Sequence, residues 1–414
     1  MAKINWRNIT LFLALVGPGI ITASVDNDAG GITTYSIAGA HFGYTLLWTL
    51  IPITIALIIV QEMASRMGVV TGKGLADLIR ENFGLKITFY VIIGLLIANF
   101  ATTVAEFAGI AAVSEIFGLS KYIIVPLCAM IIWFFIVKAN YRTLEKVFLF
   151  LTFFYLTYII SGILAKPDWS LALKNTFVPS FQLSSDYLLV MIGVIGTTIT
   201  PWMQFYLQSS IVEKGIKIEQ YAYSKWDVII GCIITDIVAF FIIIATAATL
   251  FYSGTRIESA SDAAVALAPL AGKYATILFA VGFFAAAFFG AAILPISTAY
   301  YFSEALGFES GINKKFNEAP QFYFILTIMI ALASLVVLIP KIPLITLMIL
   351  SQVINGIILP VILIFMLLLV NNKKIMGEHT NSLFYNIFAW SVCVGIIILT
   401  ALLVITTVFP RMFR

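Results

Sequence analysis

The stretch Asp26-Asn27-Asp28-Ala29-Gly30-Gly31 interrupts the first long apolar segment of the chain, at roughly residues 10–40. A second stretch, Gly196-Thr197-Thr198-Ile199-Thr200-Pro201, interrupts another apolar segment at roughly 186–212. These residue types form helices poorly, so we expect breaks near 26–31 and 197–201. Either break alone would also fit a packing kink, because Gly and Pro are common in membrane helices. Two breaks at matching positions predict an inverted-repeat transporter with its binding site near the middle of the membrane.

The composition places the chain in a membrane. Of 414 residues, 61% are hydrophobic and 11% are charged, whereas soluble domains have about 45–50% apolar and about 25% charged residues. Apolar runs of about twenty residues, enough to cross a bilayer, recur along the whole sequence. We therefore predict an all-α polytopic membrane protein with about 11 transmembrane helices. The predicted spans are 10–40, 44–65, 87–113, 122–138, 145–165, 186–212, 228–252, 274–302, 322–340, 344–370 and 384–409.

The predicted spans form a single transmembrane domain over residues 1–414. Its first repeat covers about 10–165, its second repeat about 186–370, and an extra helix about 384–409. The first apolar run is followed by Asp26 instead of a small-residue cleavage site, so we interpret it as mature structure and not as a signal peptide. Most of the 24 Lys and Arg residues fall on the cytoplasmic side if the N-terminus is cytoplasmic. We expect a multi-pass plasma membrane protein oriented in this way.

The cysteines and histidines exclude several kinds of site. Cys128, Cys232 and Cys393 lie in apolar spans without a C-x-x-C pair, so we expect packing residues and no disulfide. The two histidines, His41 and His379, fall in predicted loops, and no hydrolase motif is present. We predict that the chain is not an enzyme. Its expected partners are the lipid bilayer and a transported ion, with no nucleic acid and no obligate protein partner.

The break in the first helix suits a cation. Unwinding a helix frees backbone carbonyls that lipid cannot satisfy, and these oxygens together with a carboxylate form a hard coordination shell. A carboxylate in mid-membrane costs at least about 2.5–3.5 kcal/mol on insertion scales, which makes Asp28 a functional candidate. The alternative is that Asp26 or Asp28 caps the second half of the helix. The two roles are compatible.

Several separated motifs resemble one known family. They are Arg66-Met67-Gly68-Val69-Val70-Thr71-Gly72-Lys73-Gly74-Leu75-Ala76, Ala105-Glu106-Phe107-Ala108-Gly109, Arg142-Thr143-Leu144-Glu145, Lys225-Trp226-Asp227, Leu350-Ser351-Gln352-Val353 with Leu359-Pro360, and Lys373-Lys374-Ile375-Met376-Gly377. Together they resemble the natural resistance-associated macrophage protein (Nramp) family of divalent metal transporters. The resemblance implies a LeuT-like fold and a metal site between helices 1 and 6.

The chain departs from the family pattern at the expected site. Where the family has Asp-Pro-Gly-Asn, this sequence reads Asp28-Ala29-Gly30-Gly31, so the acid is kept and the amide becomes Gly31. The family's Met-Pro-His corresponds to Thr200-Pro201-Trp202, although Met203 would supply sulfur after a one-residue shift. A hydroxyl in place of a thioether suits Mg²⁺ or Mn²⁺, and a roomier cavity would suit an ion that keeps its waters. The chain therefore resembles the Nramp-related magnesium transporter branch.

The same comparison removes two groups that the family associates with proton movement. The acid position of helix 3 reads Thr103, and the histidine position of helix 6 reads Trp202. The resemblance thus implies transport with weak proton coupling or none. The alternatives left open are titration of Asp28, Glu106 or Asp236, a proton-coupled Mn²⁺/Fe²⁺ symporter, and a sodium-coupled organic solute transporter.

The remaining polar positions each have two interpretations. Glu106 either lines a hydrated cavity or forms an internal pair, and Gln352 either supports the site or bonds two helices. Asp236 either restores a lost ligand or forms a salt bridge or cap. The predicted metal positions are Asp28, Gly31, Val25, Thr197, Thr200, Glu106, Gln352 and Asp236, for transported Mg²⁺ or Mn²⁺ and not for a resident cofactor.

Other charged residues have simpler interpretations. Glu62 is one helical turn from Arg66 and is expected to pair with it. Asp227, like Lys225 and Arg142, is expected at a cytoplasmic helix end, where charged groups reach water.

Overall fold

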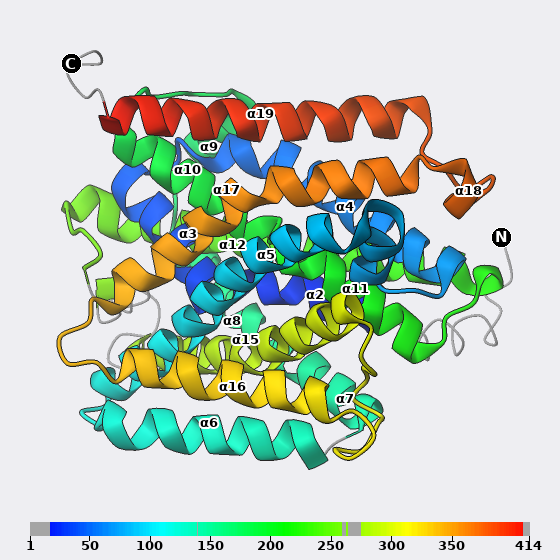
Figure 1. Cartoon of the computed structure of the whole chain (residues 1–414). Coiled ribbons are helices and arrows are strands. Elements are labelled where there is room, and N and C mark those ends of the chain that lie inside the picture. Colours follow the sequence, from blue (N-terminus) through cyan, green and yellow to red (C-terminus); the bar gives the residue numbers. More distant parts are fainter. Residues whose placement is uncertain (1–16, 139, 259–261, 264–274, 409–414) are drawn as a thin grey trace, which may run out of the picture.

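The computed structural model describes residues 17–138, 140–258, 262–263 and 275–408 (Figure 1). Every regular element within these residues is helical. Part of the first predicted span, residues 10–16, lies outside the described residues, and so does residue 274 of the eighth. The helices are α2 (Pro18–Ser24), α3 (Ala29–Phe42), α4 (Leu50–Thr71), α5 (Leu75–Ile116), α6 (Lys121–Lys138), α7 (Tyr141–Leu151), α8 (Leu156–Leu164), α9 (Trp169–Phe177), α10 (Ser185–Thr198), α11 (Pro201–Lys214), α12 (Tyr221–Thr246), α15 (Ala275–Leu306), α16 (Pro320–Val337), α17 (Leu344–Val370), α18 (Lys373–Met376) and α19 (Leu383–Val408).

The helices confirm the predicted membrane fold. Ten segments of the described residues are long and apolar enough to cross a membrane. The first predicted span is not among them because its halves, α2 and α3, have only 7 and 14 residues. The short 3₁₀ turn η1 (Val25–Asn27) connects these halves. Helices α10 and α11 form the second broken helix, and Ile199 and Thr200 separate them.

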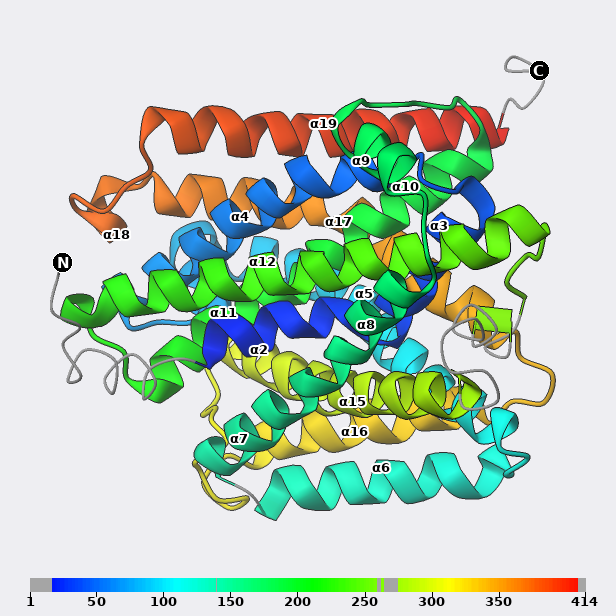
Figure 2. The ribbon, with the colours of Figure 1, turned by 180° about the vertical axis from the view of Figure 1, so that it is seen from behind.

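The long helices lie side by side in a bundle, with α19 along one flank and α6 along the opposite flank (Figure 1). Helix α2 runs through the middle of the bundle, beside α12 (Figure 2). It begins at one end of the bundle, whereas α19 ends at the other end (Figure 2). All residues of η1 and nearly all of α2 and α3 are buried, so backbone groups freed by the break face protein and not lipid.

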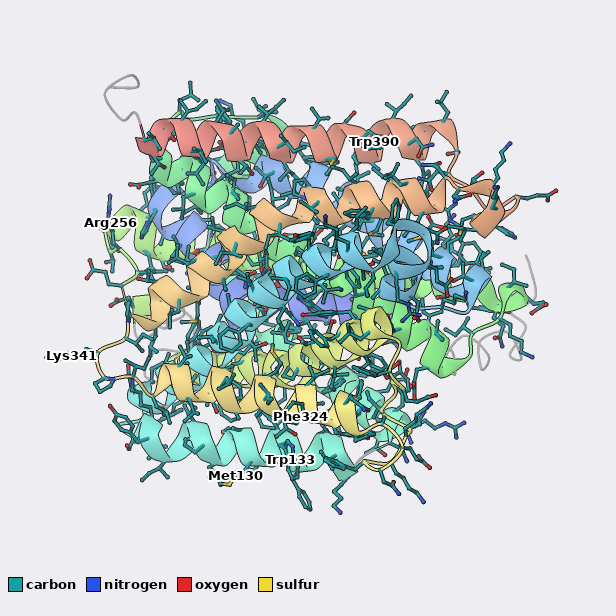
Figure 3. The ribbon with its side chains drawn as sticks, viewed as in Figure 1. Met130, Trp133, Arg256, Phe324, Lys341 and Trp390 are labelled. Carbon is teal, nitrogen blue, oxygen red and sulfur yellow. The ribbon has the colours of Figure 1, made fainter. Side chains whose placement is uncertain are left out.

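The outer helices present apolar side chains outward. Met130 on α6, Phe324 on α16 and Trp390 on α19 are 62%, 64% and 39% exposed (Figure 3). Arg256 and Lys341 lie together at one end of the bundle (Figure 3). An apolar girdle with charged groups at the ends is the pattern expected of a bilayer-spanning protein.

Small residues bring helix 1 into direct contact with α12. A Cβ atom added at Gly231 would lie 2.8 Å from Ile20 Cα, and one added at Gly39 would lie 2.3 Å from the Ile243 carbonyl oxygen. Glycine thus allows backbone-to-backbone packing of α12 on both halves of helix 1, as in other membrane helix pairs. This packing fixes the position of the break relative to α12.

Some sequence expectations need correction. His41 lies in the last turn of α3 and not in a loop, whereas His379 does lie in a loop. Helix α5 begins at Leu75, well before the predicted span at 87–113, and bends at Gly84, where φ is 80°. Helix α9 was not predicted; it begins at Trp169, and the side chain of the preceding Asp168 caps it. These features depend on local turns that hydropathy alone does not report.

Candidate metal site at the helix breaks

The break in helix 1 extends over Val25–Asp28, slightly earlier than predicted. Asp28 has an extended backbone, with φ of −68° and ψ of −175°, and α3 begins at the next residue. Asp28 Oδ1 accepts a hydrogen bond of 2.6 Å from the Gly31 backbone N–H. The capping role considered for Asp28 is therefore confirmed. Its carboxylate sits where the exposed N–H groups of a helix start favour negative charge.

The break in helix 6 lies directly beside the break in helix 1. The Thr197 hydroxyl donates to the Asp26 carbonyl oxygen over 3.2 Å, and the Thr200 hydroxyl donates to the Thr197 carbonyl oxygen over 2.6 Å. Pro201 occupies the first turn of α11, where its missing N–H leaves no bond unmade. The two hydroxyls predicted as ligands thus lie at the contact between the two broken helices.

Glu106 reaches the same place from α5. Its Oε2 accepts a hydrogen bond of 3.2 Å from the Ala29 backbone N–H, and its carboxyl group lies within hydrogen-bonding distance of the Asp28 carboxyl group. Glu106 is fully buried, and its Oε1 has no hydrogen-bond partner. A Cβ atom added at Gly290 of α15 would lie 2.5 Å from Glu106 Oε2, so the side chain fills the space above that glycine. Glu106 thus links α5 to the first turn of α3.

Gln352 approaches the start of α3 from α17. A Cβ atom added at Gly30 would lie 2.0 Å from Gln352 Nε2 and 3.3 Å from Asp28 Oδ1. Gln352 Oε1 accepts a hydrogen bond of 3.1 Å from Asn355 Nδ2, which also donates to the Thr102 hydroxyl over 2.9 Å. The Nε2 group of Gln352 has no hydrogen-bond partner. Asn355 was not predicted, although its spacing of three residues from Gln352 places it on the same helix face.

The structure brings Asp236 close to Asp26. Asp236 lies on α12, is 5% exposed and has no hydrogen-bond partner on either carboxylate oxygen. The groups that act on Asp28 are Glu106, Gly31 and Gly30, whereas the charge of Asp236 acts on Asp26. The predicted metal positions therefore separate into two groups.

The replacement of the family amide by Gly31 does not leave empty space at that residue, contrary to the expected enlargement of the cavity. A Cβ atom added at Gly31 would lie 2.0 Å from the Asp26 carbonyl oxygen and 2.9 Å from the Thr197 hydroxyl oxygen. The neighbouring backbone occupies this space. The Val25 carbonyl is likewise engaged, because it accepts the Asp28 backbone N–H over 3.0 Å.

The groups at the two helix breaks that could coordinate a metal ion are carboxylates and neutral oxygens. In the part of the chain that the structure describes, no group of three or more His, Cys, Asp or Glu side chains is arranged to hold a metal ion. An ion at the breaks would instead meet Asp28 and Glu106 together with hydroxyl, amide and carbonyl oxygens. That donor set suits hard cations such as Mg²⁺, Ca²⁺ and Mn²⁺.

The two positions associated with proton movement hold groups that do not titrate. The Thr103 hydroxyl donates to the Asn99 carbonyl oxygen over 2.7 Å. Trp202 is 2% exposed and packs edge-on against Tyr206, with 5.9 Å between ring centroids. His41 lines a separate cavity of about 420 Å³ at the far end of α3.

For Glu62 and Asp227 the sequence predicted simple roles, and the structure confirms only that of Glu62. Glu62 pairs with Arg66 over 3.1 Å, as predicted. Asp227, expected at a water-accessible helix end, is instead 1% exposed. Its carboxylate accepts the backbone N–H groups of Gly17, Gly19 and Ile20 over 3.2, 2.6 and 3.2 Å. It caps the first half of helix 1, which sequence position alone did not reveal.

An all-helical membrane bundle with two adjacent broken helices and a buried carboxylate between them has the architecture of a secondary transporter. Residues 19–406 match the family described as natural resistance-associated macrophage protein-like, so the chain belongs to the Nramp family. Members of this family carry divalent metal ions. The chain is accordingly a multi-pass divalent metal transporter.

Solved structures share this fold. The manganese transporter of Eremococcus coleocola, in complex with an aromatic bis-isothiourea substituted compound, has a TM-score of 0.80 at 22% sequence identity, covering 98% of this chain and 88% of that chain. MhsT in complex with L-phenylalanine has a TM-score of 0.60 at 13% identity, covering 93% and 98%. A nucleobase-cation-symport-1 family transporter in a closed conformation has a TM-score of 0.58 at 14% identity, covering 94% and 90%. At these identities the likeness shows the fold.

Proposed function

We propose that this protein carries Mg²⁺ and Mn²⁺ across the plasma membrane by alternating access, at a site centred on Asp28, without proton coupling. The observation that carries the proposal is the buried carboxyl pair of Asp28 and Glu106 at the start of α3. Two carboxylates match the charge of one divalent ion. Both carboxylates accept hydrogen bonds from backbone N–H groups in the first turn of α3. These bonds hold the two carboxylates in place when the ion leaves.

The chemistry of the neighbouring donors supports a hard ion. Thr200 supplies a hydroxyl at the position where the family carries a thioether. Soft thioether ligands favour transition metals, whereas oxygen ligands accept Mg²⁺ and Mn²⁺. We infer that the loss of the thioether broadens the site toward Mg²⁺.

The absence of proton coupling is supported by Thr103 and Trp202, which hold the positions associated with proton movement. Both are buried, and neither titrates near neutral pH. With the N-terminus in the cytoplasm, an inside-negative membrane potential of 100 mV favours entry of a divalent ion by about 4.6 kcal/mol, since each charge contributes about 2.3 kcal/mol. This driving force suffices for uptake along the potential.

The proposal is tested in proteoliposomes that contain a Mg²⁺-sensitive dye and, in a parallel preparation, a pH-sensitive dye. We expect Mg²⁺ influx that depends on an inside-negative potential and proceeds without internal acidification. Competition by Mn²⁺ should slow Mg²⁺ influx. Mn²⁺ influx coupled to acidification, with no response to Mg²⁺, would instead support a proton-coupled Mn²⁺/Fe²⁺ symporter, and solute uptake driven by Na⁺ would support an organic solute transporter.

The position of the site is tested with Asp28→Ala, which should abolish influx of every divalent ion. Asp168→Asn is a matched control, because Asp168 caps the short helix α9 far along the chain and Asn also caps helices well. Both variants should have the same yield and elution volume. Normal transport by Asp28→Ala would show that the site is misplaced.

A further inference from the structure

A second acidic pair lies beside the break in helix 1. Asp26 in η1 and Asp236 in α12 are 2% and 5% exposed, and the charge of Asp236 acts directly on Asp26. Both oxygens of both carboxylates lack a hydrogen-bond partner. Burying a charged carboxylate without a partner is strongly unfavourable, so a cation bound between the two groups would stabilise their charged forms.

Several neighbouring polar groups of this pair present oxygen acceptors. Asn27 uses its Nδ2 group for the Thr235 carbonyl and hydroxyl oxygens, over 3.1 and 2.6 Å, and its own Oδ1 has no partner. The Thr54 hydroxyl lies beside Asp236 but donates its proton to the Leu50 carbonyl oxygen over 2.7 Å. Thr54 therefore presents an oxygen acceptor to Asp236. A buried cluster of oxygen acceptors matches the ligand set of a hard cation.

This pair is separate from the pair at Asp28. Asp28 is held by Gly31 and lies against Glu106 of α5, whereas the Asn27–Thr235 bonds tie η1 to α12. The residues adjacent to Asn27 and Thr235 are Asp26 and Asp236. The two bonds therefore hold the segments that carry Asp26 and Asp236 against each other.

We propose that Asp26 and Asp236 form a second site for a divalent cation, which the transported ion occupies before or after the site at Asp28. This inference rests on the proposed function, because the transported ion is the occupant. Asp26 lies in η1, at the break itself, and Asp236 lies on α12 beside it. Two carboxylates neutralise one divalent ion, and the oxygen acceptors around them suit Mg²⁺ or Mn²⁺.

The proposed second site has a consequence for ion release. Asp28 and Asp26 are close enough for the charge of one to act on the other. An ion that arrives at one site therefore lowers the affinity of the other site for a second ion. Multiple adjacent sites of moderate affinity allow an ion to enter a buried path and still leave it.

Crystals of the full-length protein soaked in MnCl₂ test the second site, because anomalous scattering locates Mn²⁺ directly. In the wild type we expect two peaks, one at Asp28 and Glu106 and one at Asp26 and Asp236. Asp236→Asn should lose only the second peak, whereas Asp28→Ala should lose the first. A single wild-type peak at Asp28 and Glu106, together with Mg²⁺ influx, would overturn the second site and leave the proposed function intact.

Transport measurements on the same variants give an independent test. Asp26→Asn and Asp236→Asn should each slow Mg²⁺ influx by about 10-fold or more, the loss typical when a metal site loses a supporting carboxylate. Asp168→Asn should transport like the wild type, and thermal unfolding midpoints verify that each variant is folded. Asp236→Ser provides a second variant if Asp236→Asn is unstable. Influx at the wild-type rate in folded Asp26→Asn and Asp236→Asn would overturn the inference.

Discussion

The carboxyl groups of Asp28 and Glu106 lie within hydrogen-bonding distance of each other, and each also accepts a backbone N–H from the first turn of α3. Two unit charges about 4 Å apart repel by about 4 kcal/mol at an effective dielectric constant of 20. A divalent ion placed against both groups removes that repulsion. The affinity for an ion therefore depends on how close these two side chains, which come from different helices, lie to each other.

The first prediction concerns Glu106→Gln. We expect the affinity for Mg²⁺ to fall by about 10- to 100-fold, because the amide keeps the shape of the side chain and removes its charge. Calorimetric titration of the purified protein with MgCl₂ measures the change. Glu81→Gln is the matched control on the same helix, since Glu81 forms an exposed ion pair with Lys73 that contributes little to stability. Equal affinities for both variants would contradict a role for Glu106 at the site.

The second prediction concerns Gly31→Ala. The added Cβ atom would lie 2.0 Å from the Asp26 carbonyl oxygen, which is backbone and cannot simply turn away. Such overpacking destabilises a protein by about 1–3 kcal/mol. We expect a lower thermal unfolding midpoint and slower Mg²⁺ influx.

Gly94→Ala is the control for this prediction. An added Cβ atom at Gly94 of α5 meets nothing within 4 Å, and Ala favours a helix more than Gly by about 1 kcal/mol. Gly94→Ala should therefore be at least as stable as the wild type. If Gly31→Ala were equally stable, the contact between the two breaks would be looser than the structure shows.

The third prediction concerns Thr200→Met, which places a thioether at the break in helix 6. Thr200 is 3% exposed and lies between the two halves of that helix. We expect Mn²⁺ and Cd²⁺ to be transported better relative to Mg²⁺, because sulfur favours softer ions. Influx rates measured for each ion in the same proteoliposomes give the ratio. Thr200→Ser, which keeps the hydroxyl, should preserve the wild-type ratio, and a wild-type ratio in Thr200→Met would place Thr200 outside the ion path.

The fourth prediction concerns Asp227→Ala. This change leaves three backbone N–H groups at the start of helix 1, two of them buried, without their acceptor. Losing hydrogen bonds to a charged acceptor should destabilise the protein by about 3 kcal/mol. A thermal unfolding series in detergent measures the loss. Asp227→Asn keeps one acceptor oxygen and should be intermediate, whereas an unchanged midpoint in Asp227→Ala would show that water replaces the carboxylate.

Much of the fold was predictable because its signals are local. Apolar runs reported the spans, and the residues around Asp28 and Pro201 reported both breaks. The early start of α5 and the existence of α9 were missed because these segments are less apolar and depend on turn residues such as Gly84 and Asp168. Hydropathy measures transfer into lipid and contains no information about such turns.

The site was predicted only in part. Asp28 stood out because a charge in mid-membrane is unfavourable, and the same argument pointed to Glu106 and Asp236. Whether two such charges meet depends on how helices distant in sequence pack. The sequence therefore grouped Asp236 with Asp28, whereas the packing of α12 against η1 brings it to Asp26.

By itself, the sequence determined that this protein is a helical membrane bundle with two broken helices and an acid at the first break, because hydrophobicity and helix propensity belong to each segment alone. Only the tertiary structure decided which groups contact one another. Glu106 lies against Asp28, Asp227 binds the start of α2, and the Asp26 carbonyl fills the space beside Gly31. The first two contacts join residues far apart along the chain. They form only because glycines such as Gly231 and Gly290 let particular helices approach closely.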